Sequence, residues 1–194
     1  MAQDACAAAG VDPATLPSVF TSAHGDLAIV DALCRTLSHN PMLLSPMRFH
    51  HSVHNAASGY FAIGAHNRQP STALAAGPCS FAAGWLEAAT QCAADGAPVL
   101  LVGCDTEATG PLQSVNSSRS ALAVALLLRP APAGPQDRAV DWALQTLTTP
   151  PEPASGNAMD AARPLFDALA DSRLTALSLP LSQTLALALN IAPA

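Results

Sequence analysis

The stretch at residues 68–105 constrains the fold more than any other part of this sequence. An apolar run at 71–76 leads into a Gly-Pro-Cys-Ser corner at 77–80, and a helical pattern then continues to the Asp-Gly pair at 95–96. A second and more apolar run follows at 98–104. Strand, corner, helix and strand in this order predict a βαβ unit with parallel strands and a right-handed connection, so we expect an α/β fold.

The helix predicted in this unit carries its apolar residues on one face. They recur every three or four residues, which is the spacing of a buried helical stripe. The members of the stripe are Phe81, Trp85, Ala88 or Ala89, and Cys92. The Asp-Gly pair that follows the stripe is expected to end the helix.

Cys79 lies at the corner where the first strand meets this helix. The helix dipole and the free backbone N–H groups at such a position favour a thiolate. A working thiol also needs a base and an oxyanion site, and all six histidines precede Cys79 in the chain. Cys79 is therefore a candidate nucleophile, and the alternative is a small residue that fills a tight corner.

Patterns on either side of this unit predict further elements. They are a helix at 2–9 closed by Gly10, a strand at 17–22, a helix at 51–65, strands at 120–129 and 139–148, and a helix opened by Asn157 or Asp160. Proline-rich stretches at 130–137 and 149–156 predict a hinge or hairpin tip and a loop. Residues 174–191 are either a strand followed by a helix or a segment that packs on something outside this chain. No strand precedes the first helix, so we expect that the chain lacks an element or borrows cover from a partner.

A further helix is expected after Asp26, which can cap it. Its apolar residues Val30, Leu33, Cys34 and Leu37 are spaced as one buried stripe. We expect Cys34, Cys92 and Cys104 to be small core residues. The five cysteines match neither a disulfide framework nor a paired zinc site, and free thiols fit a reducing cytoplasm.

Length and composition narrow the class of protein. The chain has 194 residues, which we interpret as one domain spanning 1–194. Half of the residues are apolar and only 11% are charged, so either the core is large or a partner covers apolar surface. The net charge of −6 without a basic run excludes nucleic acid as an expected partner. No apolar run approaches the roughly 20 residues of a membrane span, and no signal peptide is present, so we expect a cytoplasmic protein without a membrane partner.

Polar residues offer few alternative sites. His50 and His54 are spaced to share a helix face with His51 between them, but no acidic or cysteine partner stands nearby, so we expect no metal site. Asp105 and Glu107 follow the most buried strand, where ligands of α/β sheets tend to bind, or they belong to a solvated loop. No phosphate loop or dinucleotide motif is present, so we expect no cofactor.

Three segments resemble the N-terminal half of a β-ketoacyl synthase: FHHSVHNAASGYFAIG, STALAAGPCSFAAGWLEAA and GAPVLLVGCDTEATGPL. They are most similar to the short branch of chain-length-factor-like proteins of bacterial aryl polyene and xanthomonadin pigment clusters. The likeness extends from about residue 2 to 129, and more loosely to the last residue of the sequence. It implies a thiolase-like layered α/β/α fold, truncated to the N-terminal half of the ketosynthase fold.

The resemblance also implies which residues matter. Active condensing enzymes carry a nucleophilic cysteine in a D-T-A-C-S-S-type turn and two histidines in their C-terminal half, whereas this corner reads AGPCSF and no histidine follows His66. Without those histidines the chain is not expected to decarboxylate malonyl groups, so no catalytic residue is assigned. The candidates for an acyl tunnel or an interface are His54, Asn55, Cys79 and Phe81.

The resulting hypothesis is a non-catalytic, chain-length-factor-like partner of an active ketosynthase. Such a chain forms a heterodimer with the synthase, or a homodimer, and meets an acyl carrier protein only indirectly. In this fold family the strand at 71–76 lies at the dimer seam. The alternatives are an acyltransferase or condensing enzyme that uses Cys79, and a homodimeric structural or binding protein of the same fold.

Overall fold

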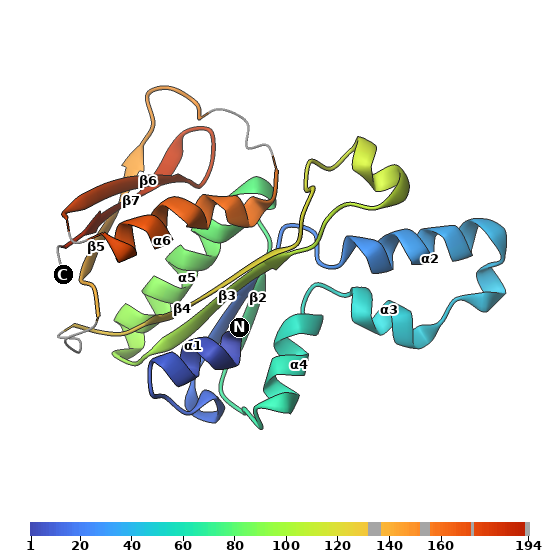
Figure 1. Ribbon diagram of the computed structural model, residues 1–194, viewed down its shortest axis with the longest axis horizontal. Coiled ribbons are helices and arrows are strands. Elements are labelled where there is room, and N and C mark those ends of the chain that lie inside the picture. The colour runs from blue at the N-terminus through green and yellow to red at the C-terminus, as the bar shows by residue number, and fades with distance from the viewer. Residues whose placement is uncertain (132–136, 152–155, 172, 193–194) are drawn as a thin grey trace.

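The computed structural model describes residues 1–131, 137–151, 156–171 and 173–192. Two sheets enclose a helical layer, with α5 between sheet A, which is formed by β1 to β4, and sheet B, which is formed by β5 to β7 (Figure 1). The predicted hinge at 130–137 and loop at 149–156 lie largely outside the described residues. The α/β class and its layers agree with the sequence prediction.

Sheet A contains the predicted βαβ unit. Its strands are β1 (Ser18–Thr21), β2 (Ser71–Leu74), β3 (Val99–Asp105) and β4 (Leu122–Leu128). The strand order is β2-β1-β3-β4, with β1 parallel to both β2 and β3, and β4 antiparallel to β3. The two strands that flank the helix are thus parallel, as predicted, but they are separated by β1 rather than paired with each other.

Sheet B corrects the expectation for residues 174–191. Its strands are β5 (Val140–Thr146), β6 (Thr175–Pro180) and β7 (Leu185–Ile191), in the antiparallel order β5-β7-β6. The expected helix after Pro180 is wrong, because that segment is β7. In β7 the leucines at 187 and 189 are fully buried and alternate with alanine, which is the two-residue period of a strand. Leucine and alanine are common in helices, but the two-residue spacing of the buried leucines is that of a strand.

The helices and short 3-10 turns complete the chain. The helices are α1 (Ala2–Ala8), α2 (Leu27–His39), α3 (Pro46–Ser52), α4 (Ala56–Gly64), α5 (Ser80–Asp95) and α6 (Arg163–Ala170). The turns are η1 (Pro13–Thr15), η2 (Pro41–Leu43), η3 (Gly77–Cys79), η4 (Gly110–Ser114) and η5 (Ala158–Ala162). The predicted caps are confirmed at Asp26, whose carboxylate accepts from two backbone N–H groups of α2, and at Gly96, which ends α5 with φ +61°.

The single helix predicted at 51–65 is wrong, because the structure divides this segment into α3 and α4. Ser45 caps α3 upstream of the predicted start, and Val53 adopts an extended conformation that ends it. His54 then lies with Nε2 2.7 Å from the carbonyl oxygen of Ser22 at the end of β1. Residue spacing cannot reveal this contact, because its two partners are 32 residues apart.

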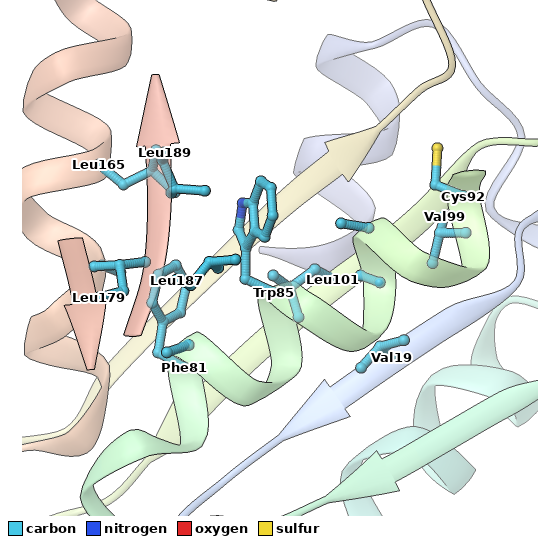
Figure 2. Close-up of a cluster of buried hydrophobic side chains, with 14 of the residues drawn as sticks. Val19, Phe81, Trp85, Cys92, Val99, Leu101, Leu165, Leu179, Leu187 and Leu189 are labelled. Atoms are coloured by element: carbon cyan, nitrogen blue, oxygen red, sulfur yellow. The ribbon is translucent and has the colours of Figure 1, made fainter. Parts of the chain in front are cut away.

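The main core lies around α5. Phe81 and Trp85 point toward Leu187 and Leu189 of sheet B, while Val19 and Leu101 of sheet A lie on the other side of the helix (Figure 2). The predicted stripe of α5 is buried along its whole length. A smaller core lies on the other face of sheet A, where α1 and α4 cover it and the rings of Phe20 and Phe61 are 5.6 Å apart.

The stripe predicted on α2 is only partly buried. Leu33 is buried, but Cys34 is exposed and the Leu37 side chain is 49% exposed. The expectation that Cys34 is a core residue is therefore wrong. The reason is that α2 and α3 project away from the sheets, so the far half of α2 does not reach the main core (Figure 1).

Candidate functional site

The carboxyl ends of β1 and β3 meet at Asp105, which is 4% exposed. Its Oδ1 accepts hydrogen bonds from the Ser22 hydroxyl at 2.6 Å, from the Ala23 N–H at 3.0 Å and from the His24 N–H at 3.2 Å. The carboxylate therefore holds the loop after β1 in place. Glu107, two residues on, is exposed. Of this acidic pair, only Asp105 contributes to the edge of the sheet.

The corner before α5 is shaped by Ser80, a residue that sequence reasoning did not single out. Its hydroxyl donates to the Gly77 carbonyl at 2.7 Å and accepts from the Ala76 N–H at 3.0 Å. The Thr21 hydroxyl at the end of β1 donates to the Ser80 carbonyl at 2.7 Å. Gly77 takes a positive φ of +54°, which favours glycine. These contacts hold the corner at the same edge of sheet A as Asp105.

A small hollow of about 40 Å³ separates these groups. His24, Pro78, Asp105 and Ser118 are among the residues that line it. Cavities that hold organic ligands usually measure roughly 300–1,000 Å³, so this hollow has room for water but not for an acyl substrate. This hollow at the edge of sheet A therefore cannot hold an acyl group.

The Cys79 thiol does not have the features of an activated nucleophile. Cys79 is the N-cap residue of α5, as the sequence predicted, yet burial raises the pKa of its thiol above the ordinary value of 9.0. Desolvation thus opposes the thiolate that the helix start was expected to favour. Within the described chain, no hydrogen bond joins Cys79 to a histidine.

This property predicts slow alkylation of Cys79. At neutral pH we expect iodoacetamide to modify the exposed Cys34 well before Cys79, since only the thiolate reacts and burial disfavours it at Cys79. Peptide mapping by mass spectrometry measures both rates, and the Cys79 rate should keep rising with pH beyond 9. A Cys34→Ser variant removes the fast reaction as a control. Faster labelling of Cys79 than of Cys34 at pH 7 would contradict the assignment.

The other candidate residues lie in different surroundings. His54 touches the end of β1 through Ser22, and Asn55 is an exposed N-cap of α4 whose side chain makes no capping hydrogen bond. Phe81 is fully buried in the main core. The structure thus brings His54 and Cys79 to the same edge of sheet A and places Phe81 inside the chain. Their roles at a tunnel or an interface stay predictions.

The histidines at 50 and 51 interact with Tyr60. The His51 ring stacks on the Tyr60 ring at 5.2 Å, and its Nδ1 lies 2.8 Å from the tyrosine hydroxyl. His50 contacts the same ring edge-on. Among the described residues, no group of three or more histidine, cysteine or acidic side chains is arranged to hold a metal ion.

The segment from α2 to α4, which we call the arm, exposes many large apolar side chains. They are Leu37, Met42, Leu43, Met47, Phe49, Val53, Tyr60 and Ile63. Met42 is 90% and Leu43 71% exposed. An exposed apolar surface of this extent marks an interaction site more often than a solvated face.

A second open feature is the outer edge of sheet A. Of the strands described, only β1 pairs with β2, so one side of β2 has no strand partner among the described residues. Such an edge presents N–H and C=O groups to which another strand can pair. None of the helices in the described ranges is long and apolar enough to cross a membrane.

Comparisons with known proteins agree with this geometry. A family model described as beta-ketoacyl synthase, N-terminal domain, matches residues 1–184. The chain is also similar to a chain in the solved structure of the ketosynthase ApeO in complex with its chain length factor ApeC from Xenorhabdus doucetiae. The TM-score is 0.70 at 24% sequence identity, with 91% of this chain and 69% of that chain covered. This similarity shows the fold. No curated protein matches the chain in sequence.

Proposed function

Because this chain belongs to the family of β-ketoacyl synthase N-terminal domains, we propose that it is a non-catalytic, chain-length-factor-like partner of an active ketosynthase. The partner carries out condensation in a polyene- or fatty-acid-type pathway of the cytoplasm. This chain supplies part of the wall that limits the growing acyl group. The acyl carrier protein then contacts the pair mainly through the synthase. The similar solved structure, which holds a ketosynthase with its chain length factor, supports the pairing.

The observation that carries the proposal is the apolar surface of the arm. Its side chains come from α2, η2, α3 and α4, and the most exposed are Met42 in η2 and Ile63 in α4. Removing apolar surface from water stabilises an assembly by about 25 cal/mol per Å². Permanent pairs bury large apolar interfaces of this kind. The unpaired edge of β2 adds a row of backbone groups that a partner strand can use.

The lack of a catalytic role is supported by Cys79 and by the histidines. The thiol occupies the corner expected of a ketosynthase nucleophile, but its pKa is raised and the hollow beside it is too small for an acyl chain. All histidines lie at positions 24 to 66, so residues 67–194 contain no imidazole like the two that condensing enzymes use downstream of their cysteine. We therefore propose that this chain shapes the acyl-binding space of the pair and that the synthase carries out the catalysis.

Co-expression tests the proposal. We expect this chain and the ketosynthase encoded beside it to purify as a one-to-one complex, measured by size-exclusion chromatography with light scattering. Leu43→Glu should weaken the complex by at least about tenfold, because a charge would be buried in the interface. Leu174→Glu is the matched control, since Leu174 is also 71% exposed but lies outside the arm.

Other outcomes would contradict the proposal. A chain that stays monomeric beside the synthase is not its partner. Stable self-association that the synthase leaves unchanged would favour the homodimeric alternative. Formation of an acyl adduct that Cys79→Ala abolishes, seen by intact-mass spectrometry after incubation with an acyl thioester, would favour the enzymatic alternative.

A further inference from the structure

A large cavity lies along α5, away from the Cys79 corner at the start of this helix. Its volume is about 690 Å³, and its walls come from α5 between Trp85 and Ala93 and from β4, β5 and α6. It lies within the range of about 300–1,000 Å³ that is usual for ligand sites. The residues of the small hollow beside Asp105 take no part in it. The two spaces are therefore separate.

The walls of this cavity are apolar and aromatic. The chain has two tryptophans, and both line the cavity, with Trp85 and Trp142 edge-to-face at a ring distance of 6.1 Å. Cys92 and Leu165 contribute buried side chains. Further apolar lining residues, only partly buried although they pack against the main core, are Leu126, Leu128, Val140 and Leu169. Water in contact with such walls is easily displaced by an apolar ligand.

The charged residues that line the cavity balance in number, because Arg129 and Arg138 stand against Asp137 and Asp141. Arg129 Nη1 lies 3.5 Å from Asp137 Oδ2, and Arg138 donates hydrogen bonds to the carbonyls of Leu169 and Ala192. The rim can therefore interact with a polar group but carries no unbalanced charge that selects a strongly charged ligand. The lining runs along α5 from Trp85 to Ala93, which spans about 12 Å at 1.5 Å per residue. A lining of this length can contact an extended hydrocarbon chain.

We propose that this cavity binds the hydrocarbon part of a fatty-acyl compound, with its polar end at the rim beside Arg129. The proposal goes beyond the pairing with a ketosynthase, because every wall of the cavity belongs to this chain. It makes the chain an acyl-binding protein by itself. Failure of either proposal leaves the other standing, since one concerns the arm and the other the space between α5 and β5.

A fluorescent conjugated fatty acid, cis-parinaric acid, is the probe for this proposal. We expect saturable one-to-one binding to the isolated chain, with quenching of tryptophan emission, because both tryptophans lie on the cavity wall. Ala93→Phe should raise the Kd by at least about tenfold, since Ala93 is exposed, lines the cavity and can carry a ring into it. Ala94→Phe, at the next exposed position of α5 but outside the lining, should leave the Kd unchanged.

A folding control and a second cavity variant exclude the possibility that Ala93→Phe weakens binding only by disturbing the fold. Thermal melting by circular dichroism checks that Ala93→Phe still folds, and Ala131→Phe blocks the cavity from the other side of its rim. Loss of affinity in both variants supports the site. Equal affinity of the probe for the wild type, Ala93→Phe and Ala94→Phe would place the probe elsewhere and overturn the proposal. Weaker binding in Leu43→Glu alone would assign the probe to the arm and would also overturn the proposal. Absence of binding to the wild type would overturn the proposal as well.

Discussion

We expect Gly84→Val to destabilise this chain by about 3 kcal/mol, at the upper end of the range for overpacked cores. Gly84 lies in the middle of α5 where the helix approaches sheet A. A Cβ atom at this position would lie 2.7 Å from Thr21 Cγ2 and 3.2 Å from Leu101 Cδ1. Both neighbours are buried in strands, so neither can move away without distorting the sheet. Urea unfolding followed by circular dichroism measures the loss.

The control for this variant is Gly59→Val. Gly59 lies inside α4, and a Cβ atom there would have no neighbour within 4 Å. The same substitution in a helix without the close approach should change the stability by no more than about 0.5 kcal/mol. Equal destabilisation by both variants would mean that helix propensity, rather than the contact between α5 and β1, determines the result.

The second large effect is expected for Arg138→Ala. The guanidinium of Arg138 donates to the carbonyl of Ala192 at 2.9 Å and to that of Leu169 at 3.1 Å, and it also bonds the Asp171 carbonyl. It therefore joins the start of β5, the end of α6 and the end of β7. Hydrogen bonds from charged donors contribute about 1.5–3 kcal/mol each and are not additive, so we expect a total loss of about 3 kcal/mol.

Amide hydrogen exchange shows which strands lose stability in Arg138→Ala. Amides of β5 and β7 should exchange faster in Arg138→Ala, while those of β1 and β3 keep their protection, because the lost contacts belong to sheet B. Arg119→Ala is the control, since Arg119 is exposed and bonds only carbonyls of its own loop. Unchanged stability of Arg138→Ala would show that sheet B is held by its apolar face alone.

Sequence patterns predicted the parts of the fold that depend on neighbours along the chain. The βαβ unit at 68–105, the cap at Asp26 and the end of α5 at Gly96 all rest on residues a few positions apart. The family resemblance, carried by three short segments, agreed with the family model over 1–184. The strands at 120–129 and 139–148 were also recognised from their apolar pattern, although β5 proved largely exposed.

The candidate site was predicted less completely. The corner at Cys79 was located, but its contacts with Thr21 and its pKa depend on groups distant in sequence. Ser80 was overlooked because a serine in a helix start is common, and only its double hydrogen bond to Ala76 and Gly77 shows its role. The large cavity at α5 had no signal in the sequence, since its walls come from four separate elements.

Local periodicity thus accounts for where strands and helices form, because hydrogen bonds and apolar spacing within a segment are set by adjacent residues. The burial of a side chain, in contrast, depends on segments that are distant in the sequence. Cys34 and Leu37 have the spacing of core residues, and yet they are exposed because the arm extends beyond the sheets. Whether an apolar face is covered, and whether a thiol at a helix start is desolvated, depends on which distant segments pack there. That information arises only when the chain is folded in three dimensions.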